Sequence, residues 1–189
     1  MANKVLFGVS NLHVGLYNVS DEGVVTLGTP IHVPGTVNIS LEAESEENTF
    51  YADNVKYWTG YSDNGYTGEL VMALFPDTFL TTFMNYVELA DGGIAEVKGN
   101  NKPAVYIAFQ CEGDQEGRRG ILYNVALGSI QHEHNTTEDS VTPDTETLPI
   151  TVSGDNKTGI IKTGYPKNAT GYATLFTNPP APALPVVSQ

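Results

Sequence analysis

Two runs with strand periodicity flank a segment that has none, and this arrangement constrains the fold more than any other feature. Residues 37–44 alternate apolar with polar side chains, and residues 66–75 are rich in β-favouring types. Between them, residues 45–65 are acidic at first and then aromatic. Structureless loops of this length are uncommon in compact domains. The segment therefore either has a function of its own or belongs to a hairpin that projects from the body.

Turn chemistry within this segment predicts local pairing. Ser62-Asp63-Asn64-Gly65 is a strong turn signal, because Asn-Gly favours the primed turn that joins twisted strands. We therefore expect residues 55–61 to pair with the chain from Tyr66 onward. Exposed Tyr and Trp side chains are typical interface anchors, but they also form small satellite cores under loops. Both interpretations stay open for Tyr51, Tyr57, Trp58, Tyr61 and Tyr66.

The next segment, residues 77–88, is predicted to be a helix. Pro76 suits the position before a helix, and Asp77 can cap free amides and favour the helix dipole. A stripe at helical spacing consists of Phe79, Leu80, Phe83, Met84 and Val87. Such a stripe indicates a helix that packs its apolar face on a sheet.

The rest of the chain is composed of short strand-like runs and turns, which predicts a mainly β fold of sandwich or barrel type with one flanking helix. Residues 104–111 are apolar at nearly every position, as in a strand buried on both faces, and they include the lone Cys111 as an expected core residue. We expect one domain over residues 1–177 and a proline-rich arm over 178–189. The arm is either loose or docked on a neighbouring subunit through Leu184, Val186 and Val187.

Charge and composition exclude several classes of function. The 9 Lys and Arg residues against 22 Asp and Glu give a net charge of −13, which argues against tight nucleic-acid binding. It does not exclude a protein that touches DNA without holding it, and a merely soluble acidic surface is the plainer interpretation. We see no signal sequence, no run able to span a membrane and no disulfide framework, so we expect a cytosolic protein.

No constellation of catalytic residues stands out, and we expect neither an enzyme nor a bound cofactor. His132-Glu133-His134 invites a metal interpretation, but its spacing does not match a helical zinc motif. Residues 113–120 are glycine-rich but lack the Lys-Ser/Thr ending of a phosphate loop. Paired acids such as Glu44 and Glu46 could in principle serve as the two carboxylates of a glycosidase. They lie in an acidic, turn-like stretch, which favours solvated surface charge instead. We therefore predict no catalytic and no metal site.

Three short stretches carry a family resemblance: Tyr51-Ala52-Asp53-Asn54 followed by Tyr57, Gly65-Tyr66-Thr67-Gly68-Glu69-Leu70, and the Pro76-Asp77 helix start. In this order they resemble the major tail proteins, or tail tube proteins, of long-tailed (siphophage-type) bacteriophages. The likeness extends to about Gly164. No second, immunoglobulin-like domain follows there, and the proline-rich end has no match in the family.

The resemblance implies rings of six subunits, joined by their inner sheets and stacked through loops and arms into a tube that DNA passes through. The long loop, with Tyr57, Trp58, Tyr61 and Tyr66, would then grip the next ring. Tape measure, tail terminator and distal tail proteins would be partners in a virion tail assembled in the host cytoplasm.

An acidic bore would let DNA slide, so we expect Glu42, Glu44 and Glu69 to face it. The alternative is a monomeric carbohydrate-binding β-sandwich whose Tyr57, Trp58 and Tyr61 stack on sugars.

Overall fold

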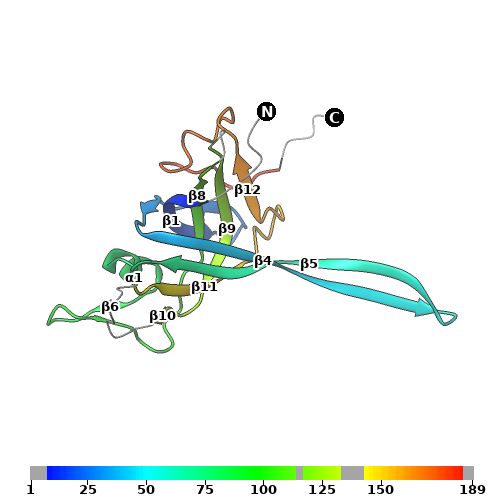
Figure 1. The fold of residues 1–189 in the computed structure, drawn as a ribbon, viewed down its shortest axis with the longest axis horizontal. Helices are drawn as coiled ribbons and strands as arrows, with labels where there is room; N and C mark the ends of the chain where they lie inside the picture. The colour runs from blue at the N-terminus through cyan, green and yellow to red at the C-terminus, as the bar shows by residue number, and fades with distance from the viewer. Residues whose placement is uncertain (1–7, 114–116, 133–142, 185–189) are drawn as a thin grey trace.

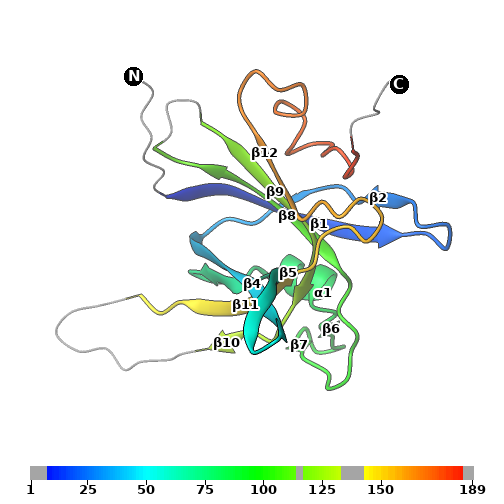
Figure 2. The same cartoon turned by 90° about the vertical axis from the view of Figure 1, so that its right-hand side faces the viewer.

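A long antiparallel sheet dominates the computed structural model, which describes residues 8–113, 117–132 and 143–184 (Figures 1 and 2). Its strands follow the order β2-β1-β8-β9-β11-β5-β4, and β3, β10 and β12 pair beside this path. β6 and β7 form a separate two-stranded sheet. The strands of both sheets are β1 (Val9–Val19), β2 (Val25–Leu27), β3 (Ile31–His32), β4 (Thr36–Ala52), β5 (Val55–Met72), β6 (Val87–Glu88), β7 (Ile94–Ala95), β8 (Val105–Cys111), β9 (Arg119–Leu127), β10 (Gln131–His132), β11 (Glu146–Val152) and β12 (Lys162–Tyr165). The mainly β fold predicted from the sequence is confirmed.

The main hydrophobic core lies inside the bend of this sheet. Leu12 and Val14 of β1 share one buried cluster with Leu70 of β5, Leu148 of β11 and Phe79 of the helix α1 (Asp77–Phe83). Strands from both ends of the sheet therefore face one another, and α1 fills the space between them. Burial of each such side chain contributes on the order of 1.5–3 kcal/mol, so this cluster fixes the sandwich-like shape.

A second core covers the outer face of β1, β8 and β9. Tyr106 and Ala108 of β8 pack there with Tyr123 of β9, under Leu175 from the carboxy-terminal segment. Residues 105–108 are consequently buried on both faces, which confirms the prediction for this strand. Cys111, expected in the core, is only half-buried because it lies at the end of β8, beside the charged turn.

The helix is shorter than predicted. It ends at Phe83, and Asn85 adopts the left-handed conformation (φ 54°) that ends helices and that Asn tolerates well. Val87 is thus not part of the helical stripe but lies in β6, 44% exposed. Pro76 occupies the cap position, so Asp77 makes no capping hydrogen bond and acts only through its charge in the first turn.

The proline-rich segment packs on its own domain as far as the structure describes it. Pro179 and Pro182 are buried, and the Tyr123 hydroxyl donates a hydrogen bond of 3.0 Å to the Pro180 carbonyl. Residues 178–184 are thus held against their own chain and are not loose, while docking of the arm on a neighbouring subunit stays a prediction. Leu184 is 60% exposed, and Val186 and Val187 lie outside the described residues.

Candidate assembly surface

Residues 45–65 form the outer half of a long β-hairpin rather than a loop. β4 and β5 pair from Thr36 opposite Met72 to Ala52 opposite Val55, and the outer half extends away from the body of the molecule (Figure 1). With about 3.3 Å per residue, it reaches roughly 25 Å beyond the sheet. Of the two possibilities left open by the sequence, the projecting hairpin is confirmed.

The predicted turn at residues 62–65 is wrong. The chain reverses instead at Asp53-Asn54, where both residues have positive φ (51° and 62°), as the primed hairpin turn requires. Asn64-Gly65 forms a bulge inside β5, where two residues stand opposite the single Glu44 and Gly65 has φ 93°. A left-handed glycine is as typical of a bulge as of a turn, and this explains the error.

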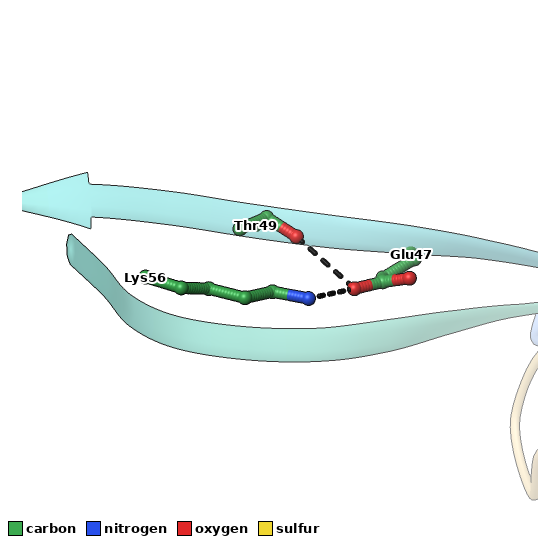
Figure 3. Close-up of polar contacts among 3 residues, drawn as sticks. All are labelled: Glu47, Thr49 and Lys56. Carbon is green, nitrogen blue, oxygen red and sulfur yellow. Dashed lines mark hydrogen bonds and ion pairs between the residues drawn. The ribbon is translucent and has the colours of Figure 1, made fainter. Parts of the chain in front are cut away.

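Few interactions hold the outer hairpin together apart from its backbone ladder. Lys56 forms an ion pair with Glu47, which also accepts a 3.3 Å hydrogen bond from the Thr49 hydroxyl (Figure 3). The hydrogen bond and charge of Lys56 lower the pKa of the Glu47 carboxyl below its ordinary value. An isolated two-stranded hairpin is marginally stable in water, so this projection would gain order from a binding partner.

The tip of the hairpin is unusually apolar for an exposed structure. Of the fourteen large hydrophobic side chains that are exposed within the described residues, six lie between residues 50 and 61. They are Phe50, Tyr51, Val55, Tyr57, Trp58 and Tyr61, and Tyr57 is the most exposed at 74%. Clustered exposed apolar groups of this kind mark interaction sites.

The pairing register distributes these side chains over both faces of the hairpin. Phe50 stands opposite Trp58, whereas Tyr61 stands opposite Glu47 on the other face. The Phe50 and Tyr57 rings meet edge to face at 6.5 Å, and the Trp58 indole lies over Gly60, where a larger residue would collide with it. Trp58 and Tyr61 therefore do not form the single flat platform that the carbohydrate-binding alternative requires.

The four aromatic residues predicted as contacts separate into two groups. Tyr57, Trp58 and Tyr61 are exposed near the tip, whereas Tyr66 is half-buried against the main core, with the Lys162 ammonium 4.2 Å from its ring. Tyr66 thus belongs to the edge of the main core, and none of the four residues forms a satellite core under the hairpin. Tyr51, also weighed from the sequence as an interface aromatic, lies on the same surface, whereas Phe50 and Val55 were not predicted to belong to it.

The second exposed feature is the free edge of β4. Within the described ranges β4 is the last strand of the sheet and pairs with β5 alone. Its outer side therefore presents a row of unpaired N–H and C=O groups, which can pair with a strand of another chain. A strand of 17 residues is a long edge to leave open in a monomer.

The acidic residues proposed for the bore lie beside this edge. Glu42 pairs with Thr67 and Glu69 with Ser40, on the face of the sheet turned away from the core residue Leu70. Thr151 and Pro149 of β11 continue this face, and none of these residues is basic. Glu44 is also exposed, but it lies at the bulge, so only Glu42 and Glu69 are placed on one surface by regular pairing.

The described chain contains no group of three metal-ligating side chains, and it has no helix long and apolar enough to span a membrane. His132 contacts Glu146 through Nδ1 at 2.9 Å, while Glu133 and His134 of the histidine motif lie outside the described residues.

No protein-family model matches this sequence, and no curated protein does. Among solved structures, the chain is similar to one in the sheath–tube complex of an extracellular contractile injection system (PVC) in its extended state. The two are 12% identical, and the alignment covers 82% of this chain and 88% of the other with a TM-score of 0.48. At this level the likeness carries no argument about function.

Proposed function

We propose that this protein is a structural subunit that assembles with copies of itself into stacked rings, forming the tail tube of a siphophage-type bacteriophage. The observation that carries the proposal is the projecting hairpin with its six exposed large apolar side chains. A projection of this kind exposes a costly apolar surface in a monomer, and a partner copy removes that cost. The resemblance of the Tyr51–Tyr57 and Gly65–Leu70 stretches to tail tube proteins supports the same role.

The free edge of β4 supports ring formation. Each subunit can pair this edge with a different strand of its neighbour, so the contact joins two unlike surfaces. Such a heterologous contact closes into a ring when successive copies are related by a suitable rotation. Closure removes every open edge, as in any β-barrel. Six subunits per ring is the number that the family resemblance implies.

The acidic face of β4 and β5 supports a conduit for DNA. We propose that Glu42, Glu69 and the adjoining Glu44 line the bore, where they repel the phosphate backbone instead of trapping it. DNA would pass during ejection without tight binding. Tape measure, tail terminator and distal tail proteins would be the further partners in the virion tail, which would assemble in the host cytoplasm.

Negative-stain microscopy of the concentrated, purified protein tests the proposal. We expect rings and stacked tubes of uniform diameter whose fraction rises with protein concentration, because assembly follows mass action. Sedimentation velocity on the same samples should show a matching loss of the monomer peak. A protein that remained monomeric at every concentration tested, and also in extracts that contain the other tail proteins, would contradict this function.

Charge reversal on the acidic face should convert the proposed bore from a repelling into a binding surface. We expect tubes of Glu42→Lys/Glu69→Lys to retain short double-stranded DNA at low salt and release it as salt increases, because each phosphate contact displaces counterions. The control is Glu22→Lys, which adds positive charge at an exposed turn residue. Filter binding at several salt concentrations measures the retained DNA. Equal DNA retention by both variants would contradict the prediction that Glu42 and Glu69 line the bore.

A further inference from the structure

We propose that the apolar hairpin tip of one copy docks in a hollow between the end of α1 and the β7–β8 loop of the next copy. This inference rests on the proposed function and identifies the surface that receives the tip. It follows from three observations: the form of the hollow, its position relative to the hairpin, and the chemistry of the two surfaces.

The hollow has a volume of about 450 Å³ and a mixed lining. Met84 and Val97 supply apolar atoms, while the polar groups come from Glu96, Lys98, Asn100, Lys102 and Ser129. Pockets that bind ligand-sized groups have volumes of about 300–1,000 Å³, so an aromatic side chain fits within this one. The alkyl stem of Lys98 can cover an aromatic ring while its ammonium group stays in water.

The wall of the hollow is already held in place without a partner. Asn85 donates a hydrogen bond of 2.5 Å to the Asn101 carbonyl, and Asn100 donates one of 2.7 Å to the Asn85 carbonyl. Lys102 donates to the Gly128 carbonyl and lies 3.3 Å from the Ser129 hydroxyl. A preformed receiving surface binds with less loss of conformational entropy than a mobile one.

The two surfaces lie at opposite ends of the molecule. In Figure 1 the hairpin tip ends the long axis on one side, and α1 and β6 lie toward the other. The lining of the hollow includes Val97, a large apolar side chain that is 45% exposed. A shift of one copy along its long axis brings tip and hollow together, which is the head-to-tail relation that stacking requires.

The chemistry of the two surfaces is complementary. The tip offers the Phe50, Tyr57 and Trp58 rings beside Asp53 at the turn. The hollow offers the exposed Lys98, which has no ion-pair partner within the described residues. Aromatic faces attract ammonium groups, and Asp53 can pair with Lys98 once the tip is seated. Lys98 and Lys102 outnumber Glu96, the one acidic residue of the lining, in a chain that has only 9 basic residues against 22 acidic ones.

Site-specific cross-linking between copies tests the docking. In a Cys111→Ser background, the variant Val55→Cys/Val97→Cys places one thiol at the hairpin tip and one at the hollow. A short bis-maleimide reagent should then link successive copies into a ladder of dimers, trimers and higher species on a denaturing gel. The aromatic residues of the tip all remain in place, and cysteine is close to valine in size, so most of the contact is retained.

The matched control is Val55→Cys/Val24→Cys, since Val24 is an exposed valine (52%) on the β1–β2 turn that does not line the hollow. It should give no ladder under the same conditions. Rings and tubes by microscopy without a Val55/Val97 ladder would overturn the docking site and leave the proposed function intact. Failure of the unmodified protein to assemble at any concentration would overturn both.

Discussion

Serine at both Phe50 and Trp58 is expected to abolish stacking of the rings while leaving the subunit folded. Each aromatic side chain is more than half exposed in the free chain, and its burial in a contact contributes on the order of 1.5–3 kcal/mol. Loss of both should therefore weaken each inter-ring contact by about 100-fold or more. Microscopy should show rings or monomers in place of tubes, and sedimentation velocity should show the corresponding smaller species.

The lone tryptophan gives a direct spectroscopic measure of the same contact. Trp58 is the one tryptophan of the chain and is 56% exposed, so its emission reports on the hairpin tip and not on the core. In the natural protein we expect a shift of emission to shorter wavelength as concentration rises and the indole leaves water. In Phe50→Ser alone the midpoint of this shift should move to higher concentration. Emission that never changes while tubes form would show that the tip stays in solvent.

A matched variant separates this effect from general loss of apolar surface. Val24→Ser removes an exposed hydrophobic side chain on the β1–β2 turn and should leave tube length unchanged. The melting temperatures of Phe50→Ser/Trp58→Ser, Phe50→Ser and Val24→Ser should all lie close to that of the natural protein, because exposed side chains contribute little to the stability of the fold. If the Phe50→Ser/Trp58→Ser protein forms tubes of normal length, the hairpin has no role in stacking.

The hairpin also shows where sequence reasoning reached its limit. The inner parts of β4 and β5 were predictable because one face is buried, which imposes the alternation of polar and apolar residues. Beyond Glu44 both faces meet solvent, so no alternation is imposed, and the segment has the composition of a loop. The turn was misplaced because Asn64-Gly65 and Asp53-Asn54 both permit positive φ, and only long-range pairing decides between turn and bulge.

The helix and the carboxy-terminal segment show two other limits. The spacing of Phe79 and Phe83 predicted the buried face of α1, but the left-handed Asn85 ends the helix before Val87. Leu175 lies in a run of turns with no periodicity of its own, so its burial depends on contacts with distant strands. The free edge of β4 and the receiving hollow likewise follow from topology, which no local pattern encodes.

Several contacts hold this carboxy-terminal segment on the sheet. The Arg119 guanidinium lies 4.1 Å from the Tyr172 ring centre and 4.3 Å from that of Phe176, and it donates a hydrogen bond of 2.6 Å to the Tyr172 carbonyl. The His13 ring stacks on Phe176 at 4.5 Å. Burial lowers the pKa of the His13 imidazole, which favours the neutral ring at this position. Leu175 itself is fully buried against the second core.

Leu175→Ala is therefore expected to destabilise the monomer strongly, with or without neighbours. Truncation of a buried leucine to alanine typically costs about 2–5 kcal/mol, because a cavity remains where the side chain packed. For a domain of this size the melting temperature should fall by roughly 5–15 °C. Urea unfolding followed by circular dichroism measures the loss. Trp58 fluorescence would not, since the indole lies outside both cores.

Leu184→Ala is the matched control, because the same side chain is removed from a position that is 60% exposed. It should change the free energy of unfolding by no more than about 0.5 kcal/mol. Equal stability of the two variants would mean that residues 172–182 do not cover β1, β8 and β9 in solution. The second core would then be open in the monomer, and these residues would be free to reach a neighbouring subunit. The difference in free energy of unfolding between Leu175→Ala and Leu184→Ala thus decides whether the carboxy-terminal segment belongs to the fold of one chain or to the contact between two chains.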